Sequence, residues 1–341
     1  MRRGQTIRAV LIAMLWLWLA GATSAQSPAA DAAGGHWDTA MRAYERDDYA
    51  AAARAFARVT ELDPKEGMAW AMLGLCEYQL GQPDRALAHI QKGRALGVAR
   101  DVQLRRVLQY HEAMLLAGRS EFERAQEIFG ELAEAGAAND DVIAGLGLTV
   151  LRIRPADATA DTVALVREAG RAEQLRVTRQ FDRAAAAYRQ LAASHPRTRN
   201  VQYAVGRYYV AARQPAEAVA AFENEIANSP DHVPARLGIA AVKAETDPAA
   251  ALPYAEEAVR LNPRVPLGHF LLGSLLLHTP DTARAIAELE AAEQDVREDP
   301  RLYYALARAY TRAGRTADAD RARATFQRLT DERQRAARRQ P

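Results

Sequence analysis

Histidine is the residue type in this chain with the widest chemical use, and its spacing argues against a catalytic or metal centre. The seven histidines are His36, His89, His111, His195, His232, His269 and His278. A helical zinc site places two histidines one turn apart, as in HExxH, and no such pair occurs. We therefore expect packed or solvated histidines and no metal ligand.

The other sequence patterns that support catalysis are also missing. No GxSxG, GxxxxGK[ST] or GxGxxG stretch occurs. Gly145 and Gly147 lie in a run with a helical pattern, where small residues favour close packing. Acidic pairs such as Asp47 and Asp48 fall at turns, whereas glycoside hydrolysis needs two carboxylates opposed across a cleft. We predict that the protein is not an enzyme and needs no cofactor.

Cys76 is the only cysteine, so no intrachain disulfide can form. Its neighbours in LGLCEYQL are mostly apolar and have a helical pattern. We expect a buried, inert thiol.

The elements that position these side chains recur with a nearly constant period. Alanines in matching contexts follow one another at steps of 34, 33, 34 and 34 along the sequence, at Ala184, Ala218, Ala251, Ala285 and Ala319. Ala52 and Ala86 show the same step near the N-terminus. A period of this size indicates a solenoid, in which each unit buries its apolar face against its neighbours. We predict an all-α solenoid of antiparallel helix pairs.

Residues 67–100 show the pattern of a single copy. Trp70, Gly74 and Ala86 lie at helical spacing in two blocks, and residues 81–83 (Gly-Gln-Pro) break the chain between them. Small residues at positions 74 and 86 indicate that the two helix backbones approach closely. The second helices are predicted to end before the prolines Pro64, Pro196, Pro230 and Pro263.

These copies resemble the tetratricopeptide repeat family. Its pattern of Trp, Leu-Gly, Gly and Ala stands here as Trp70, Leu73, Gly74, Gly81 and Ala86, and again as Leu272, Gly273 and Ala285. The resemblance extends from about residue 34 to 332. It implies a right-handed superhelix whose inner surface binds a protein or peptide.

One irregularity interrupts the period. The step from Ala125 to Ala184 is 59, nine short of two periods, and one helix is missing after residue 153. We predict an irregular hinge at 154–161 that separates an N-terminal lobe, 36–153, from a C-terminal lobe, 162–333. The alternative is that a long helix over 162–179 fills the gap and the superhelix continues smoothly.

The first 25 residues have the pattern of a secretory signal peptide. Three arginines precede an apolar run over 9–22, and cleavage is expected after Ala25. We predict an exported protein of the bacterial periplasm or cell envelope, without a transmembrane anchor once the signal is cleaved. A retained N-terminal anchor is the alternative. Residues 26–35 are predicted to be a disordered lead-in, and 334–341 a solvated basic tail.

The charge balance gives no reason to expect nucleic acid binding. Of the 45 Lys and Arg residues, three lie in the predicted signal, leaving 42 against 43 acidic residues. Nucleic acid binding draws on clustered positive charge, and a nearly neutral chain supplies little.

The candidate binding residues follow from the resemblance, which implies that the second, fifth, ninth and twelfth positions of each copy face the inner groove. Large aromatic, Met and Arg side chains at or near these positions need a partner or form exposed patches. The predicted contact residues are Trp37, Met41, Tyr44, Tyr78, Tyr110, Tyr203, Arg207, Phe270, Tyr304 and Arg308.

Two readings of these residues stay open, as do two kinds of partner. The rings either contact a ligand or pack between successive first helices. The first partner class is a protein segment bound by a non-enzymatic scaffold. The second is a glycan or an envelope synthase held by an accessory subunit. Asn200 is the only asparagine placed in the groove, which argues against the Lys/Asn clamp of known peptide-binding members.

Overall fold

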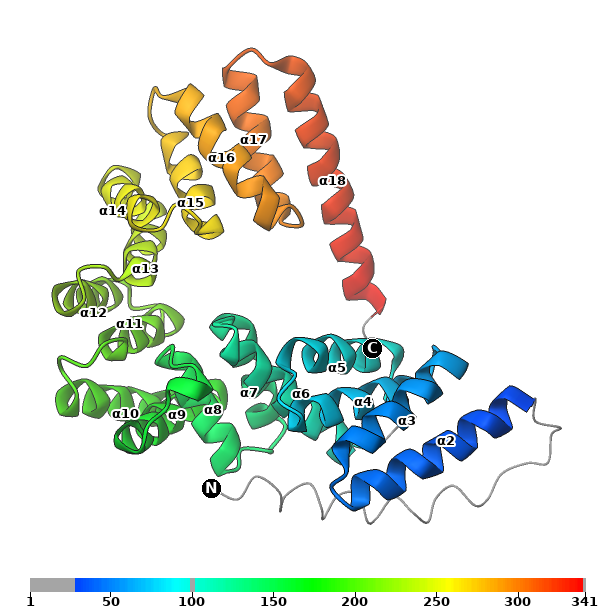
Figure 1. Cartoon of the computed structure of the whole chain (residues 1–341). Coiled ribbons are helices and arrows are strands. Elements are labelled where there is room, and N and C mark those ends of the chain that lie inside the picture. The colour runs from blue at the N-terminus through cyan, green and yellow to red at the C-terminus, as the bar shows by residue number, and fades with distance from the viewer. Residues whose placement is uncertain (1–27, 99–101, 340–341) are drawn as a thin grey trace. The chain divides into compact units, whose positions relative to one another are not determined.

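The computed structural model describes residues 28–98 and 102–339 of the 341. Within them the regular structure is α-helix with two short 3₁₀ turns, and no strand occurs. The predicted all-α repeat architecture is therefore confirmed (Figure 1). The predicted signal peptide, residues 1–25, lies outside the described residues.

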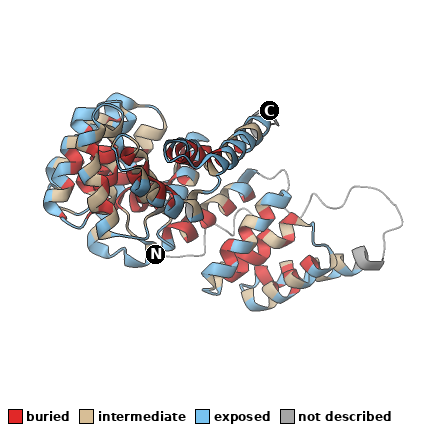
Figure 2. Ribbon diagram, turned by 90° about the horizontal axis from the view of Figure 1, so that it is seen from above, coloured by how far each residue is buried: buried red, intermediate tan, exposed pale blue. Residues whose placement is uncertain are grey.

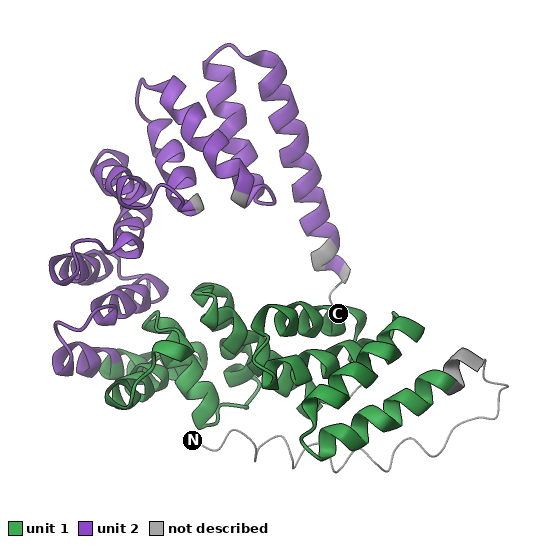
Figure 3. Ribbon diagram, viewed as in Figure 1, with its two compact units in different colours: residues 1–187 green, residues 188–341 purple. Residues whose placement is uncertain are grey.

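The chain divides into two compact units, residues 1–187 and 188–341, shown in green and purple in Figure 3. The division falls inside helix α10 (Phe181–Ser194). Each unit is described by itself below.

Unit 1 consists of consecutive helices in which each pair packs closely. The helices are α2 (Pro28–Glu45), α3 (Tyr49–Leu62), α4 (Gly67–Gln79), α5 (Pro83–Leu96), α6 (Val102–Gly118), α7 (Phe122–Glu134), α8 (Asp140–Val150) and α9 (Val163–Val177). The first residues of α10 complete the unit.

Unit 2 repeats the same arrangement, again with each pair packed closely. After the end of α10 it contains α11 (Val201–Ala211), α12 (Pro215–Asn228), α13 (Val233–Ala244), α14 (Pro248–Leu261), α15 (Pro266–Leu276), α16 (Thr282–Val296), α17 (Pro300–Arg312) and α18 (Thr316–Arg339).

Small residues decide how closely paired helices approach. The alanines that mark the repeat period are all at most 1 % exposed. A Cβ added to Gly74 would lie 2.9 Å from the carbonyl oxygen of Ala86, as the sequence predicted. Figure 2 shows buried residues on the faces between helices and exposed ones on the outside. Each pair therefore buries its apolar face against its neighbours.

Helix ends follow the turn residues of the sequence. The helices α3, α12 and α14 end two positions before Pro64, Pro230 and Pro263. Proline fixes its own φ and disfavours helical backbone in the residue before it, so the second helices stop there.

The irregular segment predicted at 154–161 exists, but the compact units divide elsewhere. Two 3₁₀ turns, Pro155–Asp157 and Ala160–Thr162, replace the missing helix. Helix α9 then packs directly on α8, so both belong to unit 1. The boundary placed at 154–161 by the sequence therefore differs from the observed division after residue 187.

Paired glycines explain why α9 can pack on α8. A Cβ on Gly147 would lie 1.8 Å from the carbonyl oxygen of Val166, and one on Gly170 would lie 1.9 Å from that of Ile143. Helix α9 thus packs on α8 as the second helix of a pair does.

The lead-in expected to be disordered is helical from Pro28 onward, because α2 runs from Pro28 to Glu45. Alanine has the highest helix propensity, and residues 28–35 contain four alanines. At the other end, α18 continues through the predicted basic tail to Arg339. Among the described helices, none is long and apolar enough to cross a bilayer.

Candidate functional site

The predicted contact residues of unit 1 lie against its core. The ring of Trp37 meets Phe56 edge-on at 5.4 Å, and Tyr110 meets Phe129 at 5.9 Å. Met41 and Tyr78 are partly buried against the same core, and Tyr44 is only 5 % exposed. These side chains therefore pack successive helices together.

Burial also governs the titration of the polar groups in this core. It raises the pKa of Tyr44 and of Tyr110 far above the usual tyrosine range. It raises the pKa of Cys76 to about 12, and Cys76 is fully buried. At neutral pH the thiol is protonated and enclosed, so it is no nucleophile.

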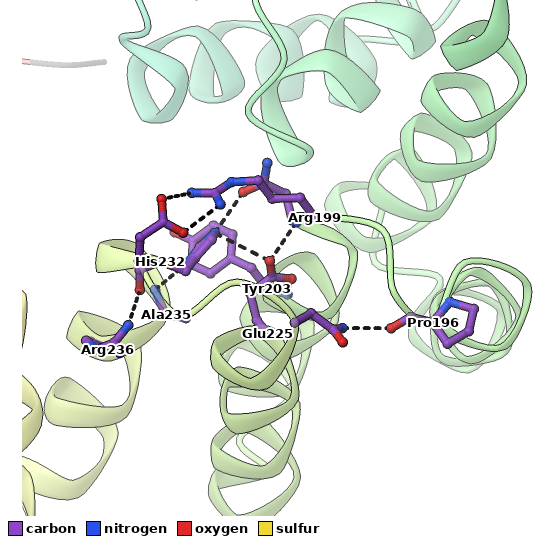
Figure 4. Close-up of polar contacts among 10 residues, drawn as sticks. Pro196, Arg199, Tyr203, Glu225, His232, Ala235 and Arg236 are labelled. Atoms are coloured by element: carbon purple, nitrogen blue, oxygen red, sulfur yellow. Dashed lines mark hydrogen bonds and ion pairs between the residues drawn. The ribbon is translucent and has the colours of Figure 1, made fainter.

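In unit 2 a buried carboxylate fixes the start of α11 (Figure 4). The side chain of Glu225 is fully buried and accepts hydrogen bonds from the backbone N–H groups of Asn200 at 2.8 Å and Tyr203 at 3.1 Å. An anion at this position satisfies donors that a helix start leaves unpaired. The side chain of Tyr203 is only 7 % exposed, and its ring lies 5.8 Å from that of Phe222 and 5.0 Å from that of His232.

A histidine extends this network to the next repeat. The N–H of Ala235 donates to Nδ1 of His232 at 3.0 Å, so Nε2 carries the proton and donates to Oδ1 of Asn200 at 2.8 Å. Asn200 has a φ of 69°, in the left-handed region that asparagine tolerates. Its side chain therefore holds two repeats together and is engaged within the protein.

An exposed ion pair joins the same two repeats beside this network. The two terminal guanidinium nitrogens of Arg199 donate to the carboxylate oxygens of Asp231, at 2.8 and 3.3 Å. The guanidinium holds the pKa of Asp231 below its usual range. The predicted contact residue Arg207, on α11, is half-buried with its guanidinium 6.0 Å from the ring of Tyr203.

Three of the predicted residues, Phe270, Tyr304 and Arg308, lie on α15 and α17, where they are joined by side chains that the sequence did not single out. Tyr304 is 54 % exposed, and its ring lies 5.8 Å from Phe326 and 5.9 Å from the guanidinium of Arg308. The ring of Phe270, one repeat before Tyr304, lies 5.8 Å from the guanidinium of Arg301. We call Phe270, Arg301, Tyr304, Arg308 and Phe326 the Tyr304 patch.

Helix spacing explains why these side chains meet. Arg301, Tyr304 and Arg308 are three and four positions apart on α17, so they share one face. Phe326 comes from α18, which packs along α17. Phe270 comes from α15, which also contacts α17.

The positive charge of the patch is only partly neutralised inside the protein. Arg301 forms a two-pronged pair with Asp299, which lowers the pKa of that carboxyl. Within the described residues, no acidic side chain forms an ion pair with Arg308 or with Arg312 one turn further on. Arg312 instead donates to the carbonyl oxygen of Leu277 at 3.1 Å. The patch thus combines aromatic rings with one guanidinium group, that of Arg308, which forms no ion pair with any residue that the structure describes.

Two members of the patch, Arg301 and Phe326, were missed by sequence reasoning. The signal was present, because Phe326 lies one period after Ala292, and Ala292 lies one period after Ala258. A large aromatic residue where the two preceding copies have alanine marks a changed surface. In the described part of the chain, no group of histidine, cysteine and acidic side chains is arranged to hold a metal ion.

Comparison with known proteins gives the family. The tetratricopeptide repeat model matches residues 38–97, 170–233 and 235–300, together more than half of the chain. The chain belongs to the tetratricopeptide repeat family. The gap in the match over 98–169 includes the segment where two 3₁₀ turns replace a helix of the repeat.

Solved tetratricopeptide repeat structures resemble about half of the chain. A crystal structure of MamA is 18 % identical with a TM-score of 0.44, covering 48 % of this chain and 96 % of that one. YrrB, described as a TPR protein with an unusual peptide-binding site, is 20 % identical with a TM-score of 0.43, covering 50 % and 92 %. No curated protein matches the sequence.

Proposed function

We propose that this protein is a non-enzymatic scaffold that binds a segment of another protein at the Tyr304 patch. The single observation that supports the site is the exposure of Tyr304, at 54 %, beside Phe326 and Arg308. Exposed aromatic rings and arginine are the side chains that contribute most to protein interfaces. Of the aromatic residues predicted from the sequence, Tyr304 alone is largely exposed.

We also propose that binding takes place after export, in the bacterial periplasm or cell envelope. The positively charged start and the apolar run of residues 1–25 support this location. A repeat array that occupies nearly all of the remaining chain leaves little room for a separate catalytic domain.

Site-specific crosslinking tests the proposed function. A photoreactive phenylalanine analogue placed at Tyr304, in the bacterium that produces the protein, is expected to capture a discrete protein partner. The matched control places the analogue at Arg189, which is exposed on α10 and outside the patch. Equal capture at both positions, or none at Tyr304, would contradict the proposal.

The glycan alternative has a separate readout. Binding of an envelope glycan to the purified protein, lost on Tyr304→Ala, would replace a protein partner with a polymer at the same patch. We expect no binding of a neutral glycan, because the guanidinium group of Arg308, which has no ion-pair partner among the described residues, favours an anionic partner.

A further inference from the structure

Inside unit 2, each second helix is covered by the first helix of the next repeat. Ala258 on α14 and Ala292 on α16 are fully buried, and α15 and α17 pack on these helices. Ala292 lies in one apolar cluster with Leu302 and Leu306 of α17. The residue at this repeat position therefore belongs to an interface between repeats.

Among the described residues, no further helix packs on the equivalent face of α18. Phe326, one period after Ala292, is only half-buried. Tyr304, one period after Phe270, is 54 % exposed, whereas Arg301 from the next repeat lies over Phe270. The exposed ring of Tyr304 and the half-buried ring of Phe326 thus lie where the first helix of another repeat would stack.

Positive charge borders this uncovered face. Arg308 lies one turn after Tyr304 on α17, with its guanidinium 5.9 Å from that ring, and no acidic side chain among the described residues pairs with it. Arg323, on α18, reaches across to the hydroxyl of Thr311 at 2.7 Å and pairs with Asp320. A partner that covers the rings must therefore approach Arg308, whose charge no carboxylate in the described chain pairs with.

We propose that the partner segment is an acidic amphipathic helix that stacks on α17 and α18 as the first helix of a further repeat would. This inference rests on the proposed function and specifies its partner. The repeat pattern favours a helix as the partner segment, because every equivalent interior face in unit 2 is covered by a helix. Charge complementarity selects acidic side chains beside the apolar stripe of that helix.

Three synthetic peptides of about four helical turns test the proposal against the purified full-length protein by fluorescence anisotropy. The first carries leucines on one face, flanked by glutamates. The second has the same composition with a proline at its centre, and the third replaces glutamate with lysine. We expect the first to bind, the second to bind roughly a hundredfold more weakly, and the third not to bind measurably.

Reversing the charge of an arginine in the protein tests whether the peptide binds at the Tyr304 patch. In the variant Arg308→Glu, the acidic peptide is expected to lose about tenfold in affinity and the lysine peptide to gain binding. Tyr304→Ala should also weaken the acidic peptide about tenfold. Arg189→Glu is the matched control and should leave both affinities unchanged. Circular dichroism and thermal unfolding establish that each variant is folded.

The outcomes separate this inference from the proposed function. If crosslinking at Tyr304 captures a protein but the proline peptide or the lysine peptide binds as well as the acidic helix, the inference fails and the scaffold function stands. Failure of all three peptides to bind also overturns the inference. If the protein self-associates and Tyr304→Ala makes it monomeric, the patch is an interface between copies, and both proposals fail.

Discussion

At the scale of single residues, the most constrained group is the buried carboxylate of Glu225. It is the acceptor for two backbone N–H groups at the start of α11, and it is fully buried. A charge in such a place is tolerated only when its hydrogen-bonding capacity is used. This network holds the backbone of Asn200 and Tyr203 in place, and the ring of Tyr203 is buried against Phe222 and His232.

Replacing Glu225 with alanine should therefore destabilise unit 2. Two buried N–H groups would lose their acceptor, at a cost of about 2–4 kcal/mol in the free energy of unfolding. Urea denaturation measures this change. Glu223→Ala, at an exposed position on the same helix, is the control and should change stability by less than about 1 kcal/mol. Equal effects of the two variants would show that the network contributes nothing.

The buried His111 predicts a pH dependence for unit 1. Burial lowers its pKa below the ordinary value of 6.5, although its ring nitrogen Nδ1 lies 2.7 Å from the carbonyl oxygen of Val107. The folded state thus favours the neutral ring, and below about pH 6.5 unfolding is accompanied by proton uptake. The contribution of His111 to stability is constant above that pH and falls as the pH drops below it.

Comparison of wild type with His111→Phe measures this dependence. Phenylalanine retains a ring between Tyr78 and Tyr110 but cannot titrate. We expect denaturation midpoints measured on both sides of pH 6.5 to fall less steeply with decreasing pH in the variant. Identical slopes would mean that His111 does not couple folding to pH.

Single-residue chemistry was only partly predictable from the sequence. The inert Cys76 followed from its apolar neighbours. Burial of Tyr203 did not, because its ring packs against Phe222 and His232, which are distant in sequence and lie on α12 and at the start of α13. Exposure of Tyr304 depends on the lack of a covering helix in the described chain, which the repeat period alone does not reveal.

At the scale of helices, the pairing of α8 with α9 depends on two glycines. Added Cβ atoms on Gly147 and Gly170 would overlap carbonyl oxygens of the opposite helix. Backbone cannot retreat as a flexible side chain can, so the helices would have to separate. The crossing therefore stabilises the region where the repeat period is broken.

Gly170→Ala should destabilise unit 1 by at least about 2 kcal/mol, because the new methyl group would lie 1.9 Å from the carbonyl oxygen of Ile143. The control is Gly35→Ala in α2, where no heavy atom lies within 4 Å of the added Cβ. That change should leave stability equal or raise it by up to about 1 kcal/mol. Thermal unfolding of the two variants gives the comparison, and a tolerated Gly170→Ala would refute the close crossing.

Helix existence and helix ends were largely predictable, because alanines, glycines and prolines recur with the period. The start of α2 was not, since residues 28–35 lack the apolar pattern and only their alanine content favours a helix. The unit boundary was also not predictable. It depends on packing between α8 and α9, and a shortened period is compatible with either a hinge or a filled gap.

At the scale of the whole molecule, the proposed export gives a direct expectation for the N-terminus. Protein purified from the producing bacterium should begin at Gln26, because small residues precede the expected cleavage point after Ala25. Mass spectrometry of the intact protein and of the fractionated cell tests this. A chain that still begins at Met1 and is found in the cytosol would contradict export.

The lone, fully buried Cys76 has a consequence for how this protein meets redox conditions. Its thiol pKa of about 12 leaves almost no thiolate to react with oxidants, glutathione or oxidoreductases. Folding and stability should therefore be the same in reducing and oxidising solution, which equal thermal unfolding with and without a thiol reductant would verify. If the protein is exported as proposed, it would therefore mature without the enzymes that form disulfides in other exported proteins.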